Sequence, residues 1–155
     1  MQFKNPLLAV NDMEKSKAFY QEVLGLSVML DFGANVTLTG GVCLQTIDSW
    51  KEFIHASDDD IVFGGRDSEI YFEEDDFDKF TEKLGSIQNI QYVHPVIEHR
   101  WGQRVLRFYD PDRHIIEVGE NMKAVCRRFL NSGMTVEQVA KRMDVPTEFV
   151  AASVR

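Results

Sequence analysis

The pattern of apolar and polar positions along the chain predicts one series of elements twice. In the first series, Phe19, Tyr20 and Val23 form an apolar face at helical spacing. Gly25 follows at a position where helices commonly end. The complete series is a strand, a helix and three strands, over residues 3–10, 12–24, 27–32, 35–39 and 42–47.

The second series repeats this order later in the chain. Phe77, Phe80 and Leu84 form the apolar face of another helix. The turn at residues 110–113 joins the last two strands, because a proline at its second position favours a type I turn. The elements of this series are expected over residues 68–73, 76–85, 90–94, 103–109 and 114–119.

The two series can be laid over each other residue by residue. A shift of 64 residues places Asn5 on Glu69, and a shift of 72 residues places Gln45 on Glu117. The difference of eight residues is an insertion in the second series, within residues 94–101. Repetition of a whole βαβββ order predicts two related modules, which is stronger evidence than any single strand.

Two segments resemble the vicinal-oxygen-chelate superfamily, which includes glyoxalases, bleomycin-resistance proteins and dioxygenases. Residues 7–26, LLAVNDMEKSKAFYQEVLGL, resemble its opening strand and helix. Residues 101–120, WGQRVLRFYDPDRHIIEVGE, resemble its closing hairpin. The resemblance covers about residues 3–120 and implies two cupped sheets that enclose a cleft for a small molecule.

We therefore expect an α+β protein with the glyoxalase/bleomycin resistance-like fold of paired βαβββ modules. The expected domain spans residues 1–120, with modules at about 3–47 and 68–119. A helical C-terminal extension is expected over residues 121–155. Fold alone does not choose a reaction, since one fold carries many functions.

The resemblance implies metal ligands at four positions, which the internal overlay also pairs: Asn5, Gln45, Glu69 and Glu117. Glyoxalase I enzymes generally present at least one His there, and this chain presents none. An all-oxygen set suits Mg, Mn or Ca better than Zn. The expected cofactor is a divalent metal (Mg, Mn, Ni or Zn) or none.

Glu69 and Glu117 are the candidate catalytic residues. With a metal, one displaced Glu would move a proton as general base while the metal stabilises a developing oxyanion. Without a metal, two inward carboxylates would repel each other, so one would hold a proton or pair with an Arg.

Four further residues are candidates for substrate binding. His99 and Trp101 lie in the inserted stretch, near the predicted mouth of the cleft. Trp50 and Phe53 lie in the linker at residues 48–67, which could cover it. The residue types favour packing of the loop and of the linker over ligand binding as the explanation.

The amino-acid composition limits the classes of binding partner that we expect. The 155 residues are 44% hydrophobic without an apolar run long enough to span a membrane, so we expect no membrane partner. Because 17 basic residues stand against 25 acidic ones, the net charge of -8 argues against nucleic acid and is compatible with a cationic ligand. Two distant cysteines and the lack of a signal-like N-terminus favour a cytoplasmic location.

The tail after Glu120 changes from strand to helix patterning. Helices are expected at residues 122–130, 135–143 and 146–154, the second starting at a Thr135–Gln138 capping box. The last two resemble a helix-turn-helix, but few basic residues line the would-be recognition helix. We expect the tail to pack on the domain or on a second subunit, as in a homodimer.

Three functions remain open. The first is a glyoxalase-like, metal-dependent lyase or isomerase acting on a small oxygenated metabolite. The second is a metal-free binding protein for a drug or antibiotic, of the bleomycin-resistance type. The third, with the least support, is a ligand-responsive regulator that uses the C-terminal helices.

Overall fold

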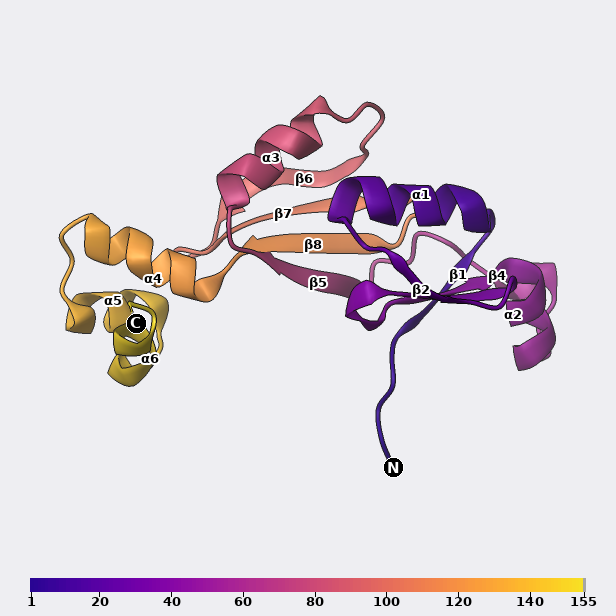
Figure 1. The fold of residues 1–155 in the computed structure, drawn as a ribbon, viewed down its shortest axis with the longest axis horizontal. Helices are drawn as coiled ribbons and strands as arrows, with labels where there is room; N and C mark the ends of the chain where they lie inside the picture. Colours follow the sequence, from indigo (N-terminus) through magenta and orange to yellow (C-terminus); the bar gives the residue numbers. More distant parts are fainter. Residues whose placement is uncertain (155) are drawn as a thin grey trace. The chain divides into compact units, whose positions relative to one another are not determined.

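The computed structural model describes residues 1–154 and divides into two compact units (Figure 1). The first unit comprises Met1–Ser68 with Tyr109–Ile115, and the second comprises Glu69–Phe108 with Ile116–Arg155. Residue 155, the last of the predicted extension, lies outside the described residues. Each unit contains one four-stranded sheet, so the predicted α+β fold of paired modules is confirmed.

The first unit has the predicted βαβββ order. Its elements are β1 (Leu7–Val10), α1 (Met13–Leu24), β2 (Val28–Asp31), β3 (Asn35–Leu38), β4 (Cys43–Thr46) and α2 (Ile47–Ile54). The sheet order is β1-β4-β3-β2, with β1 parallel to β4 and the other pairs antiparallel. The first strand begins at Leu7 rather than at residue 3, directly after Pro6, which has no N–H to donate to a ladder.

Local sequence signals set the limits of α1. The Asp12 side chain accepts a hydrogen bond from the Lys15 backbone N–H and caps the first turn. Gly25 adopts a left-handed conformation with φ of 70° and ends the helix. Tyr20 and Val23 are buried, as the helical spacing predicts.

Helix α2 is absent from the sequence prediction, which treated residues 48–67 as a linker. It runs from Ile47 to Ile54 and ends where His55 adopts a left-handed backbone conformation. The predicted ligand-binding residues Trp50 and Phe53 lie on this helix, and Phe53 is exposed. The segment was too short, and its helical pattern too brief, to be separated from a loop.

The turn between the last two strands belongs to the first unit, where it forms a buried polar network with α1. Asp110 accepts hydrogen bonds from the Tyr20 hydroxyl at 2.9 Å and from the His114 backbone N–H at 2.8 Å. Its carboxylate also lies 2.8 Å from His114 Nδ1. Burial, together with the charge of Asp110, raises the pKa of Tyr20 well above its ordinary value. The phenol therefore remains a donor to Asp110 at neutral pH.

The second unit repeats the order and adds three helices. Its elements are β5 (Glu69–Glu74), α3 (Phe77–Ser86), β6 (Tyr92–Glu98), β7 (Arg104–Tyr109), β8 (Ile115–Glu120), α4 (Met122–Asn131), α5 (Val136–Met143) and α6 (Thr147–Ala152). The sheet order is β5-β8-β7-β6. Strand β6 runs through the stretch predicted to be an insertion loop, where the prediction ended it at residue 94. Pro95 fits within it because β6 is an edge strand.

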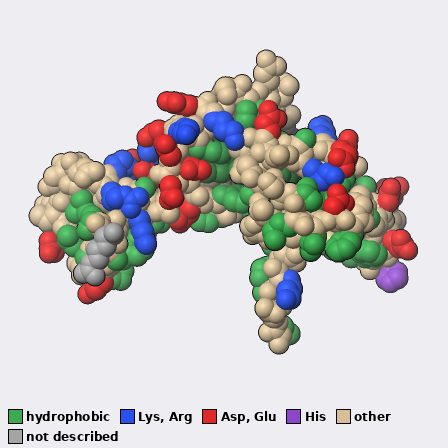
Figure 2. All heavy atoms as spheres, in the orientation of Figure 1, with side chains coloured by type: hydrophobic (Ala, Val, Ile, Leu, Met, Phe, Trp, Pro, Cys, Tyr) green, Lys and Arg blue, Asp and Glu red, His purple; other side chains and the backbone are tan. Residues whose placement is uncertain are grey.

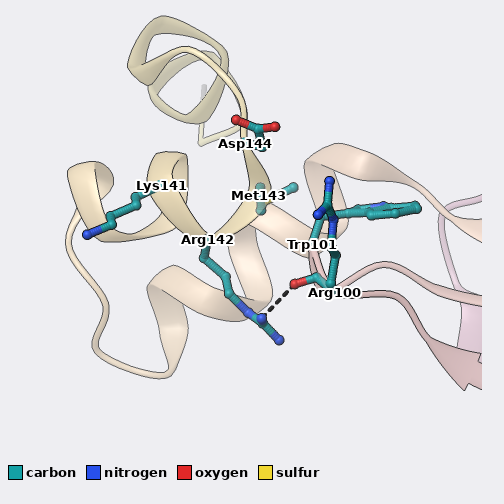
Figure 3. A pocket seen from close by; sticks show the side chains of 6 residues that line it. All are labelled: Arg100, Trp101, Lys141, Arg142, Met143 and Asp144. Atoms are coloured by element: carbon teal, nitrogen blue, oxygen red, sulfur yellow. Dashed lines mark hydrogen bonds between the residues drawn. The ribbon is translucent and has the colours of Figure 1, made fainter.

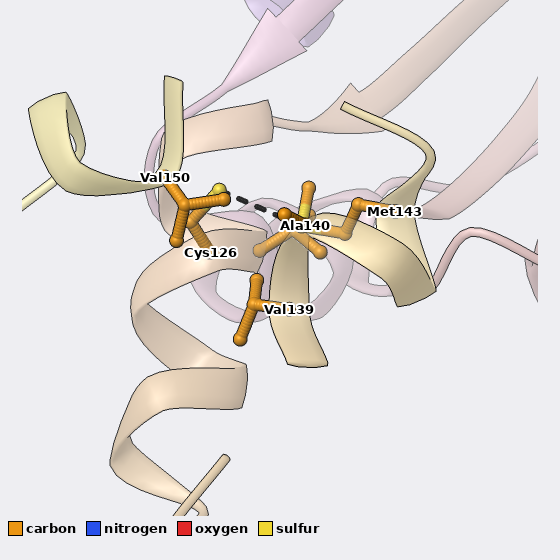
Figure 4. Close-up of a cluster of buried hydrophobic side chains, with 6 residues drawn as sticks. Cys126, Val139, Ala140, Met143 and Val150 are labelled. Carbon is orange, nitrogen blue, oxygen red and sulfur yellow. Dashed lines mark hydrogen bonds between the residues drawn. The ribbon is translucent and has the colours of Figure 1, made fainter. Parts of the chain in front are cut away.

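The three C-terminal helices have a hydrophobic core of their own (Figure 4). Its fully buried members are Val125, Cys126, Val139, Ala140, Met143 and Val150. The predicted capping box is present, with the Thr135 side chain accepting from the Gln138 N–H and the Gln138 side chain accepting from the Thr135 N–H. The helical extension is therefore an ordered part of the second unit.

A buried carboxylate at the end of β8 joins the extension to the sheet. Glu120 accepts hydrogen bonds from Arg104 on β7, at 3.1 Å, and from Arg128 on α4, at 2.9 Å and 3.1 Å. Its side chain is 4% exposed. Burial alone would raise the pKa of Glu120, but the two guanidinium groups together lower it below its ordinary value.

The surface of the described residues mixes charged and apolar side chains (Figure 2). Several exposed apolar residues lie on or next to the edge strand β2, namely Val28, Met29, Leu30 and Phe32. None of the helices within residues 1–154 combines the length and the apolar character that a membrane span requires.

We predict that Glu120→Gln destabilises the second unit at neutral pH by about 2–3 kcal/mol, because two charge-assisted interactions of a buried group are weakened. A lowered pKa means that the ionised Glu120 stabilises the fold above its unfolded-state pKa of about 4.3, and that this contribution is lost as the pH falls through the folded-state pKa. Urea denaturation at pH 7 and at about pH 3 should show a penalty that shrinks in acid.

The exposed Glu82 on α3 provides the control, since Glu82→Gln removes one carboxylate without breaking a buried pair. An equal penalty for Glu120→Gln at both pH values would contradict the assignment of this stabilisation to the ionised carboxylate.

Candidate functional site

A row of polar side chains crosses the second sheet, with one member from each strand. In the order of the sheet these are Glu69 on β5, Glu117 on β8, Arg107 on β7 and His94 on β6. Glu69, Glu117 and His94 each contact Arg107. The row therefore consists of two carboxylates and one imidazole around one guanidinium. The structure thus brings together the two predicted catalytic residues, Glu69 and Glu117.

Arg107 is the centre of this row. Its Nε donates to Glu69 Oε2 at 2.7 Å, and its Nη2 donates to Glu69 Oε1 at 3.4 Å. Nη2 also forms an ion pair with Glu117 Oε2. On the other side, Nη1 lies 3.1 Å from His94 Nε2. One planar guanidinium therefore serves both carboxylates, which is a geometry that Lys could not reproduce.

The row lies on the face of the sheet opposite α3. Arg104 forms an ion pair with Asp78 of α3 at 2.7 Å, so Arg104 and its partner Glu120 mark the covered face. Side chains alternate along a strand, so Arg107 and Glu117 point to the other face. By the same alternation, Ile116 and Val118 point to the face opposite that of Glu117.

The three charged side chains of the row differ in their exposure to solvent. The side chain of Glu69 is 36% exposed, that of Arg107 is 23% exposed and that of Glu117 is 8% exposed. Glu117 Oε2 contacts Arg107 but has no hydrogen-bond partner of ordinary geometry among the described residues. A molecule arriving from solvent would therefore meet Glu69 and Arg107 first, with Glu117 beneath them.

The first unit has an uncharged cluster at its corresponding positions. Gln45 on β4 is buried; its Oε1 accepts from Asn35 Nδ2 at 2.7 Å, and its Nε2 donates to Ser49 Oγ. Asn5 donates to Cys43 Sγ at 2.6 Å. The amide groups of both predicted ligands are thus engaged in hydrogen bonds within their own unit.

The internal repeat explains why these two clusters resemble each other. The shift of 72 residues that places Gln45 on Glu117 also places Asn35 on Arg107. In both units, the residue on the third strand of the module contacts the residue on the fourth, through a hydrogen bond from Asn35 to Gln45 and an ion pair between Arg107 and Glu117. Arg107 and Asn35 are not among the residues predicted from the sequence, although the same overlay pairs them ten residues before Gln45 and Glu117.

Two of the four predicted metal ligands, Glu69 and Glu117, belong to the second unit and share a cation of the protein itself. Glu69 and Glu117 are both bound to Arg107, and a guanidinium between two carboxylates occupies the position that a shared cation would need. Residues 1–154 contain no group of three or more His, Cys, Asp or Glu side chains placed to hold a metal ion. The residues therefore do not fit a divalent metal in this arrangement, and metal binding stays a prediction.

The remaining predicted residues lie elsewhere. Trp50 and Phe53 are on α2 in the first unit. His99 and Trp101 lie in the connection between β6 and β7, and their rings stack with centroids 4.2 Å apart. Burial lowers the pKa of His99, and the charges of Arg107 and His94 lower it further, so its ring is neutral at pH 7. The ligand-binding roles of these four residues stay predictions.

Comparison with known proteins shows which family and which solved structures this chain is similar to. A family model described as a glyoxalase-like domain matches residues 3–123. A solved structure of a protein of unknown function from Agrobacterium tumefaciens is 38% identical, covering 79% of this chain and 95% of that chain with a TM-score of 0.70. No curated protein matches the sequence.

More distant solved structures share the fold. A glyoxalase-related enzyme from Fulvimarina pelagi is 18% identical, over 77% of this chain and 88% of that chain, with a TM-score of 0.65. A genomically encoded fosfomycin resistance protein from Listeria monocytogenes is 19% identical, over 81% of this chain and 98% of that chain, with a TM-score of 0.59.

We predict that Arg107→Met lowers the free energy of unfolding by about 3–5 kcal/mol, because Glu117 would remain as a buried carboxylate without a cation. Urea denaturation would measure the loss. The double variant Arg107→Met with Glu117→Gln should recover much of it, since the unpaired charge is removed as well.

Arg100→Met provides the control, because Arg100 is exposed and forms no ion pair within the described chain; its effect should stay below about 0.5 kcal/mol. If the single and double variants at Arg107 lost the same stability, the pairing with Glu117 would not be the source of the effect.

Proposed function

Since the chain belongs to the glyoxalase-like domain family of the vicinal-oxygen-chelate superfamily, we propose that it is a metal-free small-molecule binding protein. The binding surface is the row formed by Glu69, Glu117, Arg107 and His94. The observation that carries this proposal is the bridging of both carboxylates by Arg107. A bridged pair is already neutralised in part and needs no metal to hold the two carboxylates together.

The charge of the row indicates the kind of ligand. Glu69 and Glu117 contribute two negative charges against one positive charge from Arg107, in a chain with a net charge of -8. A ligand with an amine would pair with the exposed Glu69 carboxylate. Hydroxyl or carbonyl oxygens next to that amine would accept from Arg107, whose planar fork presents several donors. An oxygenated, cationic small molecule satisfies both groups.

The decisive experiment combines metal content with ligand binding. Plasma mass spectrometry of the purified, untagged protein should find no stoichiometric divalent metal. Thermal unfolding with a panel of amino sugars and amino alcohols should give ligands that raise the melting temperature equally with and without chelator. For such a ligand, Glu69→Gln should weaken binding by about tenfold or more.

Glu82→Gln on α3 controls for the loss of one negative charge and should leave the affinity unchanged. Near-stoichiometric metal that is lost in both Glu69→Ala and Glu117→Ala would overturn the proposal. That result would favour the metal-dependent lyase or isomerase, and α-ketoaldehyde substrates would then be the next to test.

We also propose that the protein forms a homodimer. The edge strand β2 exposes Val28, Met29 and Leu30, and an apolar edge is commonly covered by another chain. Light scattering coupled to size exclusion should give twice the mass of 17.8 kDa, and Leu30→Lys should shift it toward one subunit. A monomeric mass for the unmodified protein would contradict this.

We also propose that the protein is located in the cytoplasm. Cys43 and Cys126 are both buried and free, which suits a reducing compartment. Cell fractionation would test it.

A further inference from the structure

A pocket lies between the β6–β7 connection and the end of α5 (Figure 3). It has a volume of about 410 Å³. Its lining residues are Arg100, Trp101, Lys141, Arg142, Met143 and Asp144. Four of the six lie beyond residue 123, where the match to the glyoxalase-like domain ends. The pocket therefore depends on the extension and is separate from the row on the second sheet.

Hydrogen bonds hold the two walls of this pocket together. Arg142 Nη1 on α5 donates to the backbone carbonyl of Arg100 at 2.6 Å, as Figure 3 shows. Arg128 Nη2 on α4 donates to the carbonyl of Gly102 at 2.5 Å. The connection is thus attached to two helices, and a pocket formed in advance loses less entropy when it binds a ligand.

Gly102 allows this close attachment. Its φ of +90° lies in the left-handed region, and a Cβ added there would lie 2.2 Å from the ring of Phe129. Any other residue would force the Phe129 ring to move and would hold a strained backbone conformation. A glycine at position 102 therefore permits the close packing of the β6–β7 connection on Phe129 of α4.

The pocket is positively charged although the chain is acidic. Three cationic side chains stand against Asp144 alone, and the face drawn in Figure 2 shows Lys and Arg side chains over the C-terminal helices. Arg142 is partly neutralised by Glu98, at 3.4 Å. Arg100 and Lys141 form no ion pair with any residue from 1 to 154, so both are available to an anion. Figure 3 shows Lys141 pointing away from Trp101, which leaves Arg100 as the principal cation.

Trp101 gives the pocket an aromatic wall. Its indole N–H donates to Gln103 Oε1 at 3.2 Å, and its ring stacks on His99, so the orientation of the ring is fixed. The indole is half-buried and lines the pocket next to Arg100 in the chain. A flat ring can stack on such a surface while an anionic group binds the neighbouring guanidinium.

We propose that this pocket binds a small aromatic molecule carrying a phosphate or carboxylate group. The anionic group would pair with Arg100 in a bidentate manner, and the ring would stack on Trp101. Lys141 would contribute through its charge at longer range. The opposite charge preference of the row on the second sheet lets the two sites take different ligands.

Tryptophan fluorescence tests the proposal directly. The chain has two tryptophans, so Trp50→Phe leaves Trp101 as the reporter. Phenyl phosphate and benzoate, which distinguish the two anionic groups, should change its emission in a saturable manner below about 10 mM, whereas phenol should not. Arg100→Ala should weaken binding by about tenfold or more, and Lys141→Ala by less.

Lys79→Ala on α3 is the matched control for loss of an exposed cation and should leave the affinity unchanged. Arg100 is exposed, so its replacement should not disturb folding, which circular dichroism would verify. Absence of saturable binding by either anion, equal binding of phenol, or equal losses in the Arg100 and Lys79 variants would overturn the proposal. Displacement of the anions by a short DNA duplex at far lower concentration, with steep salt dependence, would also overturn it and assign the surface to nucleic acid.

Discussion

A carboxylate removed from water requires a cation or several hydrogen-bond donors, and four buried carboxylates lie between residues 110 and 120. Asp112 accepts hydrogen bonds from the backbone N–H and the side-chain amide of Asn11. Asp110 receives donors from α1 and from its own turn. Glu117 is paired with Arg107 on the neighbouring strand. Glu120 is paired with Arg104 and Arg128. The hairpin formed by β7 and β8 is therefore stabilised by carboxylates that bind side chains of α1, β7 and α4.

Each of these partners connects the hairpin to a different part of its unit. The donors to Asp110 fix the turn on helix α1 in the first unit. The partner of Glu117 creates the polar row on the open face of the second sheet. The partners of Glu120 join the same sheet to α4 on the other side of the strand. One short strand thus carries the candidate site on one face and the attachment of the extension on the other.

Much of this arrangement could be predicted from the sequence, because it depends on local patterns. The βαβββ repeat, the caps at Asp12 and Gly25 and the capping box at Thr135 are all encoded within a few residues. The pairing of Asn5 with Glu69 and of Gln45 with Glu117 came from spacing alone. The two members of this set in the second module, Glu69 and Glu117, lie on the adjacent strands β5 and β8.

What the sequence could not supply was the partner of each charge. Arg107 is one of 17 basic residues, and only the strand register places it beside Glu117 rather than beside Glu120. Helix α2 was missed because eight residues give too few turns for a periodic signal. Strand β6 was ended too early because Pro95 argues against a strand unless its edge position is known.

The two modules carry different chemical groups at corresponding positions of their third and fourth strands. In the first, Asn35 and Gln45 form a neutral amide pair; in the second, Arg107 and Glu117 form a charged one. A neutral pair can be buried at low cost and is satisfied by its own hydrogen bonds, whereas a buried ion pair costs more and attracts a ligand that completes it. The charged pair is also the one with an exposed second carboxylate, Glu69, within reach of the same guanidinium. Because of this asymmetry we propose the second sheet as the place for recognition, while the matching positions in the first sheet hold its strands and α2 together.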